Sequence, residues 1–413
     1  METISLKMKK EMESGIGKIE RKVFYAQAIY GKEEKEAVAR TLENPWLASG
    51  PKVKEFEQTM AKIFAKEYAL AVNSGSSANL LALGALELPE GSEVITPALT
   101  FNTTVSAIYQ NRLRPVFVDS VIGRYTIDEE QVEGAVGPET KAIMVPHLVG
   151  GVADLRKLRE IADKHDLVLV DDSCDTIAPY LDGEPVARFS DLATTSFYGS
   201  HIITALGFGG MVFTNDRAKV DKITVLRDWG RIGGDVEDFD KRFGYEIDGI
   251  PYDHKFLYSE MGYNLKLNES AAAFGLEQVK RLPGFLHTRK INFITLKSFF
   301  ANYEEFFHLP EVIPGADTNW LAFPLTIKEG APFSRYDFLK HMESKGIQTR
   351  VLFSGNVTRH PAYQKADFRV YGQLKNADYV MARGLLLGCH QGMGLEDLGY
   401  VTQTANEFLA NYR

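Results

Sequence analysis

The sequence predicts an α/β fold: a large domain built on a mostly parallel sheet, followed by a smaller αβ domain. Between about residues 68 and 214, short apolar β-rich runs alternate with amphipathic stretches of helical period. This alternation favours parallel strands covered by helices on both faces. The chain has 413 residues, of which 45% are hydrophobic, enough for two domains with a sizeable core.

Seven apolar runs predict the strands of this sheet. They are Tyr68–Val72, Glu93–Thr96, Arg114–Val118, Ala142–Val145, Leu167–Asp171, Asp191–Ser196 and Gly210–Thr214. The stretches between them predict helices, among them Ser77–Leu86, Thr103–Gln110, Asp154–His165 and Asp216–Leu226. Ligands of such sheets bind outside the carboxyl ends of the strands, so site residues are expected in the loops that follow strands.

The second half of the chain is predicted to leave this sheet. Arg231–Asn264 is aromatic and charged without a clear period, which predicts a long loop or excursion. A helix over Glu269–Arg281 is expected to end at Pro283, because proline breaks helices. A further helix over His287–Tyr303 leads into a compact αβ tail. The predicted domains are residues 1–284, an N-terminal segment with the large domain, and residues 285–413, the small domain.

The charge balance limits the classes of partner. There are 47 basic and 55 acidic residues, a formal net charge of −8, which argues against a nucleic-acid coat or a polybasic membrane binder. A local basic pocket for a phosphorylated small molecule remains compatible with this charge. No apolar run approaches the ~20 residues that a membrane-spanning helix needs, and the first 22 residues lack a secretory apolar core. We expect a cytoplasmic protein.

Cysteine is scarce. The sequence contains two cysteines, Cys174 and Cys389. They are too few for a disulfide framework and for an iron–sulfur cluster held by four cysteines. We expect neither a metal nor a cluster.

The first loop with chemistry is Asn73–Asn79, which follows a predicted strand and opens a helix. Small and hydroxyl residues at a helix N-terminus present free backbone N–H groups to an anion, and the helix dipole adds attraction. The alternative is a simple serine N-cap. The loop therefore indicates either a phosphate cradle or an ordinary helix start.

The second loop is Asp171–Asp175, at the end of an apolar strand. A carboxylate there could keep a cofactor's pyridinium nitrogen protonated, or could cap the next helix. Ser196–Thr204 supplies hydroxyls and a histidine before the glycine-rich turn Gly207–Gly210, and Phe101 follows another strand. The alternatives are a structural histidine and a core phenylalanine. Together, the four loops describe a pyridoxal-phosphate site: phosphate cradle, stacking aromatic, carboxylate and reactive side chain.

These motifs, in this order, resemble those of the sugar aminotransferase (DegT/StrS-like) family of fold type I pyridoxal-phosphate (PLP) enzymes. The family acts on nucleotide-linked keto sugars, and the resemblance extends from about Tyr25 to Arg413. It implies a PLP-binding large domain with a seven-stranded sheet and a small C-terminal domain. The motifs are Ser74–Ser76, Pro97–Phe101, Asp172, Ser196 and Gly262–Asn264.

One position departs from most of that family. The family's lysine, which binds the cofactor covalently, corresponds here to His201, and no lysine occurs between Lys164 and Lys219. A histidine at this place marks the 4-keto-6-deoxyhexose 3-dehydrase and 3-dehydratase branch. Four stretches resemble that branch, most closely its CDP-sugar 3-dehydrases: Arg227–Arg231, Lys241–Tyr245, Tyr252–Lys255 and Asn356–Arg359.

Two further departures concern the branch itself. Its CDP-sugar enzymes carry a [2Fe–2S] cluster on cysteines that follow the stretch equivalent to Arg227–Arg231, whereas residues 232–235 here contain no cysteine. A cluster-dependent radical reduction is therefore not expected. The turn Gly207–Gly210 holds Phe208 where the family has glutamate, and one extra residue separates it from His201.

The resemblance implies roles by position. Asp172 would pair with the pyridine nitrogen, Phe101 would stack on the ring, and His201 would move a proton at the cofactor's C4′ carbon. Asn264 resembles an asparagine that reaches the phosphate of the neighbouring subunit, which implies a homodimer with shared sites. The phosphate and ring contacts are Gly75, Ser76, Ser196, Cys174 and Asp175. Candidate contacts for the sugar nucleotide, each of which could instead serve in surface ion pairs or packing, are Trp46, Ser49, Gly50, Arg227, Arg231, Arg359 and His360.

The implied reaction is loss of the C3 hydroxyl from a nucleotide-linked 4-keto-6-deoxyhexose, with pyridoxamine phosphate (PMP) as the reacting form of the cofactor and glutamate as the amino donor. One alternative is another PLP-dependent reaction on a nucleotide sugar: an atypical dehydration, an oxidation or a transamination. A second is a non-catalytic sugar-nucleotide-binding regulator. His201 argues against transamination, and Asp172 with the phosphate cradle argues against the regulator.

Overall fold

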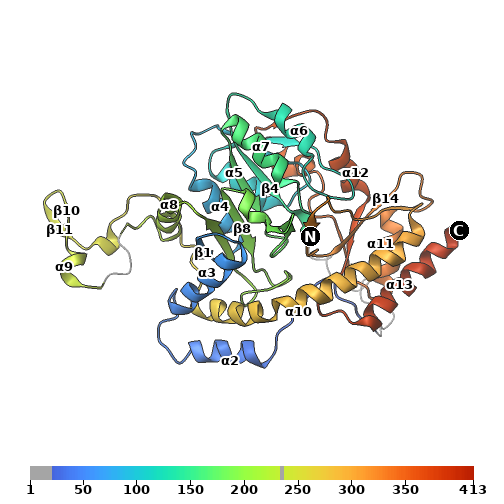
Figure 1. The fold of residues 1–413 in the computed structure, drawn as a ribbon, viewed down its shortest axis with the longest axis horizontal. Coiled ribbons are helices and arrows are strands. Elements are labelled where there is room, and N and C mark those ends of the chain that lie inside the picture. The colour runs from blue at the N-terminus through green and yellow to red at the C-terminus, as the bar shows by residue number, and fades with distance from the viewer. Residues whose placement is uncertain (1–20, 233–236) are drawn as a thin grey trace, which may run out of the picture.

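The large sheet of the computed structural model has eight strands, one more than predicted (Figure 1). The structure describes residues 21–232 and 237–413. The strand order across the sheet is β1-β9-β8-β5-β4-β2-β3-β16. In chain order the strands are β1 (Tyr68–Val72), β2 (Glu93–Pro97), β3 (Arg114–Val118), β4 (Thr140–Pro146), β5 (Val168–Asp172), β8 (Leu192–Ser196), β9 (Gly210–Thr214) and β16 (Arg369–Val370).

The sheet is mostly parallel, as predicted. β9 runs antiparallel to its neighbours β1 and β8, and the other pairs are parallel. Strands β2, β8 and β9 are buried at every position, which explains why they are continuous apolar runs. All seven predicted strands are present within two residues of their expected ends. The eighth, β16, pairs Arg369 with Val116, and its two residues are too few for periodicity to predict.

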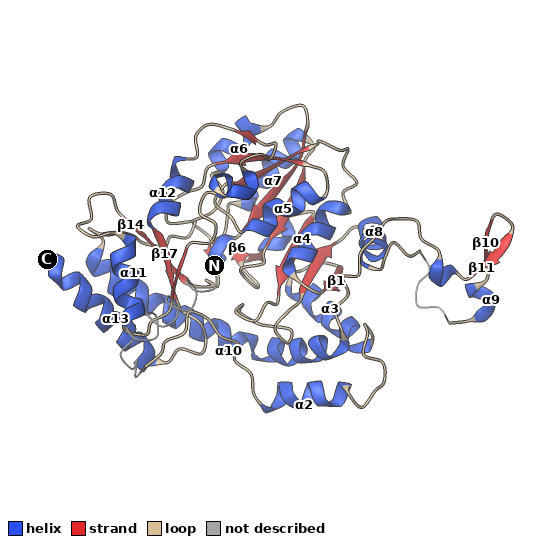
Figure 2. Cartoon of the chain, turned by 180° about the vertical axis from the view of Figure 1, so that it is seen from behind, coloured by secondary structure: helices blue, strands red, loops and turns tan. Residues whose placement is uncertain are grey.

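Helices cover both faces of the sheet (Figures 1 and 2). Apolar residues of α4, α5 and α8 form one core with one face. Those of α6 and α7 cover the other face over β2 to β5. The helix α3 and the start of α10 (Glu269–Phe300) cover it over β1, β8 and β9. The helices flanking the sheet are α3 (Pro51–Ile63), α4 (Gly75–Gly84), α5 (Asn102–Gln110), α6 (Glu129–Ala135), α7 (Leu155–His165) and α8 (Arg217–Arg227).

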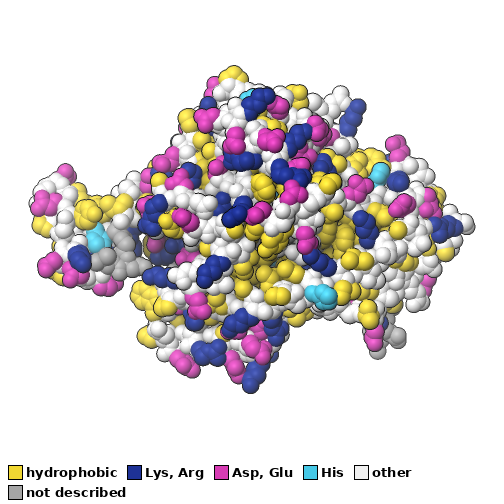
Figure 3. All heavy atoms as spheres, viewed as in Figure 1, with side chains coloured by type: hydrophobic (Ala, Val, Ile, Leu, Met, Phe, Trp, Pro, Cys, Tyr) yellow, Lys and Arg dark blue, Asp and Glu magenta, His cyan; other side chains and the backbone are white. Residues whose placement is uncertain are grey.

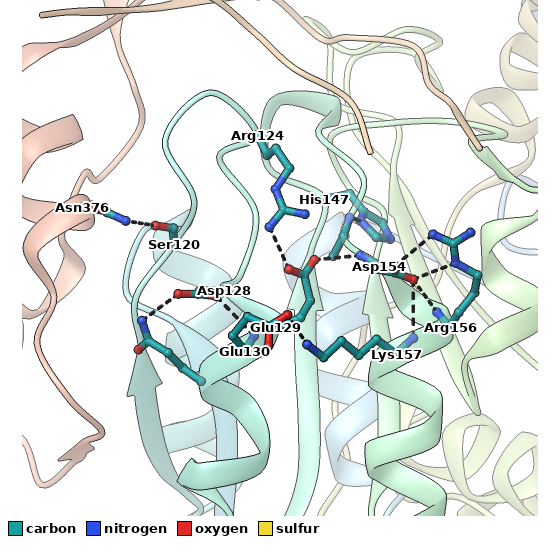
Figure 4. Close-up of polar contacts among 12 residues, drawn as sticks. Ser120, Arg124, Asp128, Glu129, Glu130, His147, Asp154, Arg156, Lys157 and Asn376 are labelled. Atoms are coloured by element: carbon teal, nitrogen blue, oxygen red, sulfur yellow. Dashed lines mark hydrogen bonds and ion pairs between the residues drawn. The ribbon is translucent and has the colours of Figure 1, made fainter. Parts of the chain in front are cut away.

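The start of α7 shows how local sequence fixes a helix. The Asp154 side chain caps it by accepting from the backbone N–H groups of Arg156 and Lys157. The buried Glu129 of α6 accepts from the Asp154 N–H at 2.8 Å and pairs with Arg124 at 2.8 Å (Figure 4). This polar junction ties α6 to α7 on the side of the sheet away from α4.

One continuous helix replaces the two predicted around Pro283. α10 runs from Glu269 to Phe300, so the prediction that a helix ends at Pro283 is wrong. A proline inside a helix costs about 3 kcal/mol. Packing offsets this cost, since the first half lies on α2 (Lys32–Thr41) and α3 and the second half is buried in the C-terminal part of the chain. The predicted division after residue 284 lies within this helix, and the two-domain division stays a prediction.

The C-terminal part has its own antiparallel sheet of four strands, in the order β12-β14-β17-β15. Its buried residues form a continuous core with the second half of α10. The strands are β12 (Phe307–His308), β14 (Phe323–Ile327), β15 (Thr349–Val351) and β17 (Gly384–Leu387), and the helices are α11 (Arg335–Ser344), α12 (Lys375–Arg383) and α13 (Leu395–Leu409). A small three-stranded sheet joins β6 (Tyr180–Leu181), β7 (Glu184–Pro185) and β13 (Ala316–Asp317).

The predicted excursion is an arm that projects from one end of the molecule (Figures 1 and 2). It carries α9 (Phe239–Arg242) and a hairpin of β10 (Tyr245–Ile247) and β11 (Ile250–Tyr252). All residues of this hairpin's strands are exposed. Residues 1–20, which make up most of the N-terminal segment that lacks a secretory apolar core, and residues 233–236 lie outside the described part of the chain. Within that part, no helix has the length and apolar character needed to cross a membrane.

Candidate active site

A cavity of about 410 Å³ lies where loops after β1, β2, β5 and β8 meet. These are the carboxyl ends of parallel strands, the position expected for a ligand site. Eight residues singled out from the sequence line it: Gly75, Ser76, Phe101, Asp172, Cys174, Asp175, Ser196 and His201. Apolar side chains gather in the centre of the face seen in Figure 3, above α10.

The start of α4 forms one wall of the cavity. Ser74 is the N-cap, and its Oγ accepts from the Ser77 N–H at 3.1 Å. The other amides of the first turn have no acceptor inside the helix, as at every helix start. A Cβ atom at Gly75 would lie 2.6 Å from Cβ of Ser196 and 2.8 Å from Sγ of Cys174. Only glycine lets the helix start approach β8 this closely, so the backbone amides and the Ser196 hydroxyl share one wall.

Gly210 makes a second close approach behind this wall. A Cβ atom there would lie 2.3 Å from the carbonyl oxygen of Ser74. The glycine-rich turn before β9 is therefore in backbone contact with the loop before α4. The turn itself uses positive φ angles, 95° at Gly207 and 134° at Gly209.

Asp172 ends β5 and is held by three donors. Its Oδ2 accepts from Nδ2 of Asn79 at 2.8 Å and from Oγ1 of Thr104 at 2.7 Å. Its Oδ1 accepts from the N–H of Cys174 at 3.2 Å. The Asn79 amide is itself oriented by Thr194, which donates to its Oδ1 at 2.6 Å. The carboxylate is therefore fixed in one orientation at the cavity while 4% of the residue stays exposed.

His201 lies in the segment that follows β8, with its ring half-buried against the cavity. Nδ1 lies 3.3 Å from the carbonyl oxygen of Ser196. A carbonyl only accepts, so Nδ1 carries the hydrogen in this contact, and in the neutral ring Nε2 is the nitrogen with the lone pair. Burial lowers the pKa of His201 to about 4. The imidazole is thus neutral at physiological pH.

Asp175 presents a second carboxyl group to the same cavity. Its Oδ2 accepts from the N–H of Val149 at 2.9 Å. Burial, with a smaller effect from the charge of Asp172, raises the pKa of Asp175 to about 7. Burial likewise raises the pKa of the neighbouring Cys174 thiol. Two carboxyl groups in one cavity therefore differ in environment: one is held by three donors, the other is desolvated.

Aromatic side chains frame the mouth of the cavity. Phe101 is 48% exposed, so it is not a core residue. Its ring meets the edge of Phe353 with centroids 5.7 Å apart. Tyr198 packs edge-on against both His201 and Phe208, with centroids 5.9 Å apart in each pair. Phe208, the departure in the glycine-rich turn, therefore contacts the site through Tyr198 and lines the cavity itself.

The residues expected to contact the sugar nucleotide do not line this cavity within one chain. Arg227 pairs with Glu57 at 3.1 Å, and Arg359 pairs with Asp378. These ion pairs match the alternative that the sequence left open for both arginines. Arg231 stacks over Trp229 at 4.9 Å.

The remaining candidates lie elsewhere too. Trp46 lines a separate hollow beside α3 and α10. Ser49 donates to the Leu267 carbonyl, and the Gly50 N–H donates to Glu269. His360 lies 2.7 Å from the carbonyl of Ser354, and Asn264 is exposed beside Asp228. Their proposed roles stay predictions.

Several lining residues were not predicted from the sequence. Asn79 and Thr104 are buried polar residues inside helices, and polarity within the apolar run of α4 was the available signal for Asn79. Tyr25 and Leu321 come from segments far from the motifs in sequence, and Phe353 lies just before the stretch Asn356–Arg359 without belonging to it. No local pattern marks them, because tertiary packing alone brings them to the cavity.

Comparison with known proteins places the chain in a family. The model of the DegT/DnrJ/EryC1/StrS aminotransferase family matches residues 28–406. The lipopolysaccharide biosynthesis protein RfbH of Salmonella typhimurium is 39% identical over 394 residues, which cover 92% of this chain and 90% of the relative. The dTDP-4-dehydro-2,6-dideoxy-D-glucose 3-dehydratase of Saccharopolyspora spinosa is 36% identical, covering 93% and 86%.

A solved structure agrees with these relatives. The crystal structure of a GDP-4-keto-6-deoxymannose-3-dehydratase with a trapped PLP-glutamate geminal diamine superimposes with a TM-score of 0.84 at 26% identity. The match covers 92% of this chain and 99% of that one. The fold is therefore that of fold type I PLP enzymes, and the chain belongs to the DegT/DnrJ/EryC1/StrS aminotransferase family.

Proposed function

We propose that the protein removes the C3 hydroxyl of a nucleotide-linked 4-keto-6-deoxyhexose, with pyridoxamine phosphate as cofactor and His201 as the base. The observation that carries the proposal is a neutral histidine, His201, in the cavity, at the position where the sequence resemblance puts a lysine in most of the family and a histidine in the 3-dehydratase branch. The names of the 3-dehydratase relatives support the substrate class.

The residues around the cavity fit this cofactor. The first-turn amides of α4 and the Ser196 hydroxyl suit a phosphate, and the missing side chain at Gly75 keeps that wall open. Asp172, oriented by its three donors, is a charge partner for a pyridine nitrogen. Phe101, half-exposed at the mouth, offers an aromatic face. When bound, such a cofactor supplies a ring that accepts the electron pair left by loss of a proton.

His201 would accept and return that proton at Nε2. Its Nδ1–H is engaged by the Ser196 carbonyl, which leaves Nε2 as the basic nitrogen of the neutral ring. Because burial keeps the pKa of His201 at about 4, the base is in its active form at neutral pH. An imidazole forms no lasting covalent bond to such a cofactor, so the helix start of α4, Ser196 and Asp172 would have to hold it by noncovalent contacts alone.

The proposal needs no iron–sulfur cluster. Cys389 is buried and its Sγ contacts the Trp320 carbonyl at 3.8 Å, while Cys174 lies at the phosphate wall. The sequence contains no other cysteine. Glutamate would supply the amino group that restores the cofactor, as the glutamate adduct in the solved relative suggests. We also propose a homodimer, in which Asn264, exposed in the single chain, serves the partner's site.

The test is turnover. The protein is incubated with pyridoxamine phosphate, glutamate and CDP-, dTDP- or GDP-linked 4-keto-6-deoxyhexoses, and the products are analysed by mass spectrometry. We expect loss of one oxygen from the sugar as a 3-deoxy-4-keto product. His201→Asn, which keeps a polar side chain without the base, should lower turnover by at least 100-fold.

Other outcomes discriminate among the alternatives. Replacement of the keto group by an amino group would show a transaminase and contradict the role of His201. Tight binding of the sugar nucleotide without turnover, under conditions in which the cofactor is bound, would indicate a regulator. A product that retains the C3 oxygen would indicate a different reaction on the same scaffold.

A further inference from the structure

Arg289 on α10 is a buried cation with no ion pair among the described residues. Its side chain is 1% exposed. Nη1 donates to the carbonyls of Trp320 and Leu321, both at 3.0 Å, and Nε donates to Oε1 of Gln391 at 2.7 Å. Nη2 has no hydrogen-bond partner in the described part of the chain. Burying a charge without a counter-charge costs folding free energy, so we expect Arg289 to have a function that offsets this cost.

Gln391 connects Arg289 to the segment that carries His201. Its Nε2 donates to the carbonyl of Ile202, the residue after His201, at 3.0 Å. A guanidinium has only donors, so the amide oxygen of Gln391 must face Arg289. The amide nitrogen is then forced toward Ile202. Arg289 on α10 therefore fixes the orientation of the Gln391 side chain, and Gln391 in that orientation holds the backbone next to His201.

The same guanidinium fixes part of the cavity wall. Leu321, whose carbonyl accepts from Arg289, lines the cavity with His201. The imidazole itself contacts the carbonyl of Ser196, which ends β8 in the large sheet. His201 is thus held from two sides, by the sheet through Ser196 and by the C-terminal part through Gln391.

We propose that Arg289 and Gln391 are positioning residues for His201: Gln391 anchors the backbone beside the imidazole, and Arg289 orients Gln391 and places a positive charge near the base. The proposal deepens the function proposed above and rests on His201 as its base.

Charge gives Arg289 a second effect. Its positive charge adds to burial in lowering the pKa of His201. It lies near Tyr25, Cys389 and His390 as well. The other titratable groups that line the cavity with His201 are Tyr25, Asp172, Cys174, Asp175 and Tyr198, and the charge of Arg289 acts on His201 from outside this lining.

The test separates the two effects. The chain has nine histidines, so the His201 imidazole is assigned in ¹³C-histidine-labelled, ligand-free protein by comparison with His201→Asn, and its titration is followed by NMR. Arg289→Met should move the His201 midpoint upward, toward the ordinary value of about 6.5. Arg289→Lys, which keeps the charge, should leave it near the wild-type value. Gln391→Leu should leave the midpoint unchanged but lower kcat about tenfold, with KM changed less than about twofold.

Lys290→Met is the matched control. Lys290 follows Arg289 on α10, is exposed and pairs with Asp317. Its loss should change neither the midpoint nor kcat. Wild-type turnover in Gln391→Leu, or a His201 midpoint that does not move in folded Arg289→Met, would overturn the proposal.

Folding and function are checked separately. Circular dichroism verifies that each variant is folded. If Arg289→Met does not fold, the proposal is judged from kcat of Gln391→Leu and from the His201 midpoint of Arg289→Lys. In that case an unchanged kcat in Gln391→Leu, or an Arg289→Lys midpoint far from wild type, would overturn the proposal. If wild-type protein removes no C3 hydroxyl, the proposed function fails, and the NMR midpoints alone decide the relation between Arg289 and His201.

Discussion

The Nδ2 atom of Asn79 lies 2.8 Å from Oδ2 of Asp172. The helix whose first turn is proposed to bind the phosphate therefore also orients the carboxylate, one turn further along. Both ends of the proposed cofactor site depend on the placement of α4, so the proposed phosphate binding and the proposed ring orientation would be linked through one helix.

Asn79→Ala tests that link. The change removes one of the three donors to Asp172, and we expect affinity for pyridoxal phosphate to fall about 5- to 30-fold, corresponding to about 1–2 kcal/mol for a lost hydrogen bond to a charged group. The dissociation constant is measured by fluorescence titration. Asn111→Ala is the control, because Asn111 bonds to backbone carbonyls of α4 and α5 rather than to the carboxylate. Equal losses in both variants would contradict the role of Asn79.

His201→Lys should convert the site toward covalent binding of the cofactor. A lysine amine at this place can condense with pyridoxal phosphate, so we expect a visible absorption band and, after borohydride reduction, a mass increase on the peptide that contains residue 201. Dehydration should fall by at least 100-fold. Wild-type protein under the same treatment serves as the control. Unchanged dehydration in this variant would show that His201 is not the base.

Asp175 predicts a pH-dependent stability. Its pKa is raised to about 7 by burial, above an ordinary value of about 3.9, so the folded state favours the protonated form. Its stabilising effect is complete below about pH 4 and is lost as pH rises to about 7. Asp175→Asn should therefore raise the free energy of unfolding of ligand-free protein by about 1–2 kcal/mol more at pH 8 than at pH 5.5. Urea unfolding at the two pH values measures this, and a difference of the opposite sign would contradict it.

Two glycines of α10 make opposite predictions. A Cβ atom at Gly284 meets nothing within 4 Å, so Gly284→Ala should stabilise the protein by about 0.5–1 kcal/mol through helix propensity. A Cβ atom at Gly275 would lie 2.8 Å from the Phe56 ring, so Gly275→Ala should destabilise it by about 1–3 kcal/mol through overpacking. The midpoint of thermal unfolding is measured for Gly284→Ala and Gly275→Ala and compared with that of the wild-type protein. The prediction fails if both variants shift the midpoint in the same direction.

The sequence predicted the parts of this structure that depend on local pattern. The strands were recognised because they are buried on both faces, and the loops with Gly75, Asp172 and His201 because each follows such a strand. The ion pair of Arg227 could not be predicted from local pattern, because its partner Glu57 lies 170 residues away in the chain. The continuity of α10 through Pro283 was missed for a related reason, because burial against distant segments outweighs a local helix breaker.

The continuity of α10 also has a consequence for folding. One helix contributes to the cores on both sides of residue 284, so neither side can melt without fraying a helix that the other needs. We expect cooperative unfolding in a single transition rather than two. A fragment that begins at residue 285 would start in the middle of α10, and its exposed apolar surface would favour aggregation.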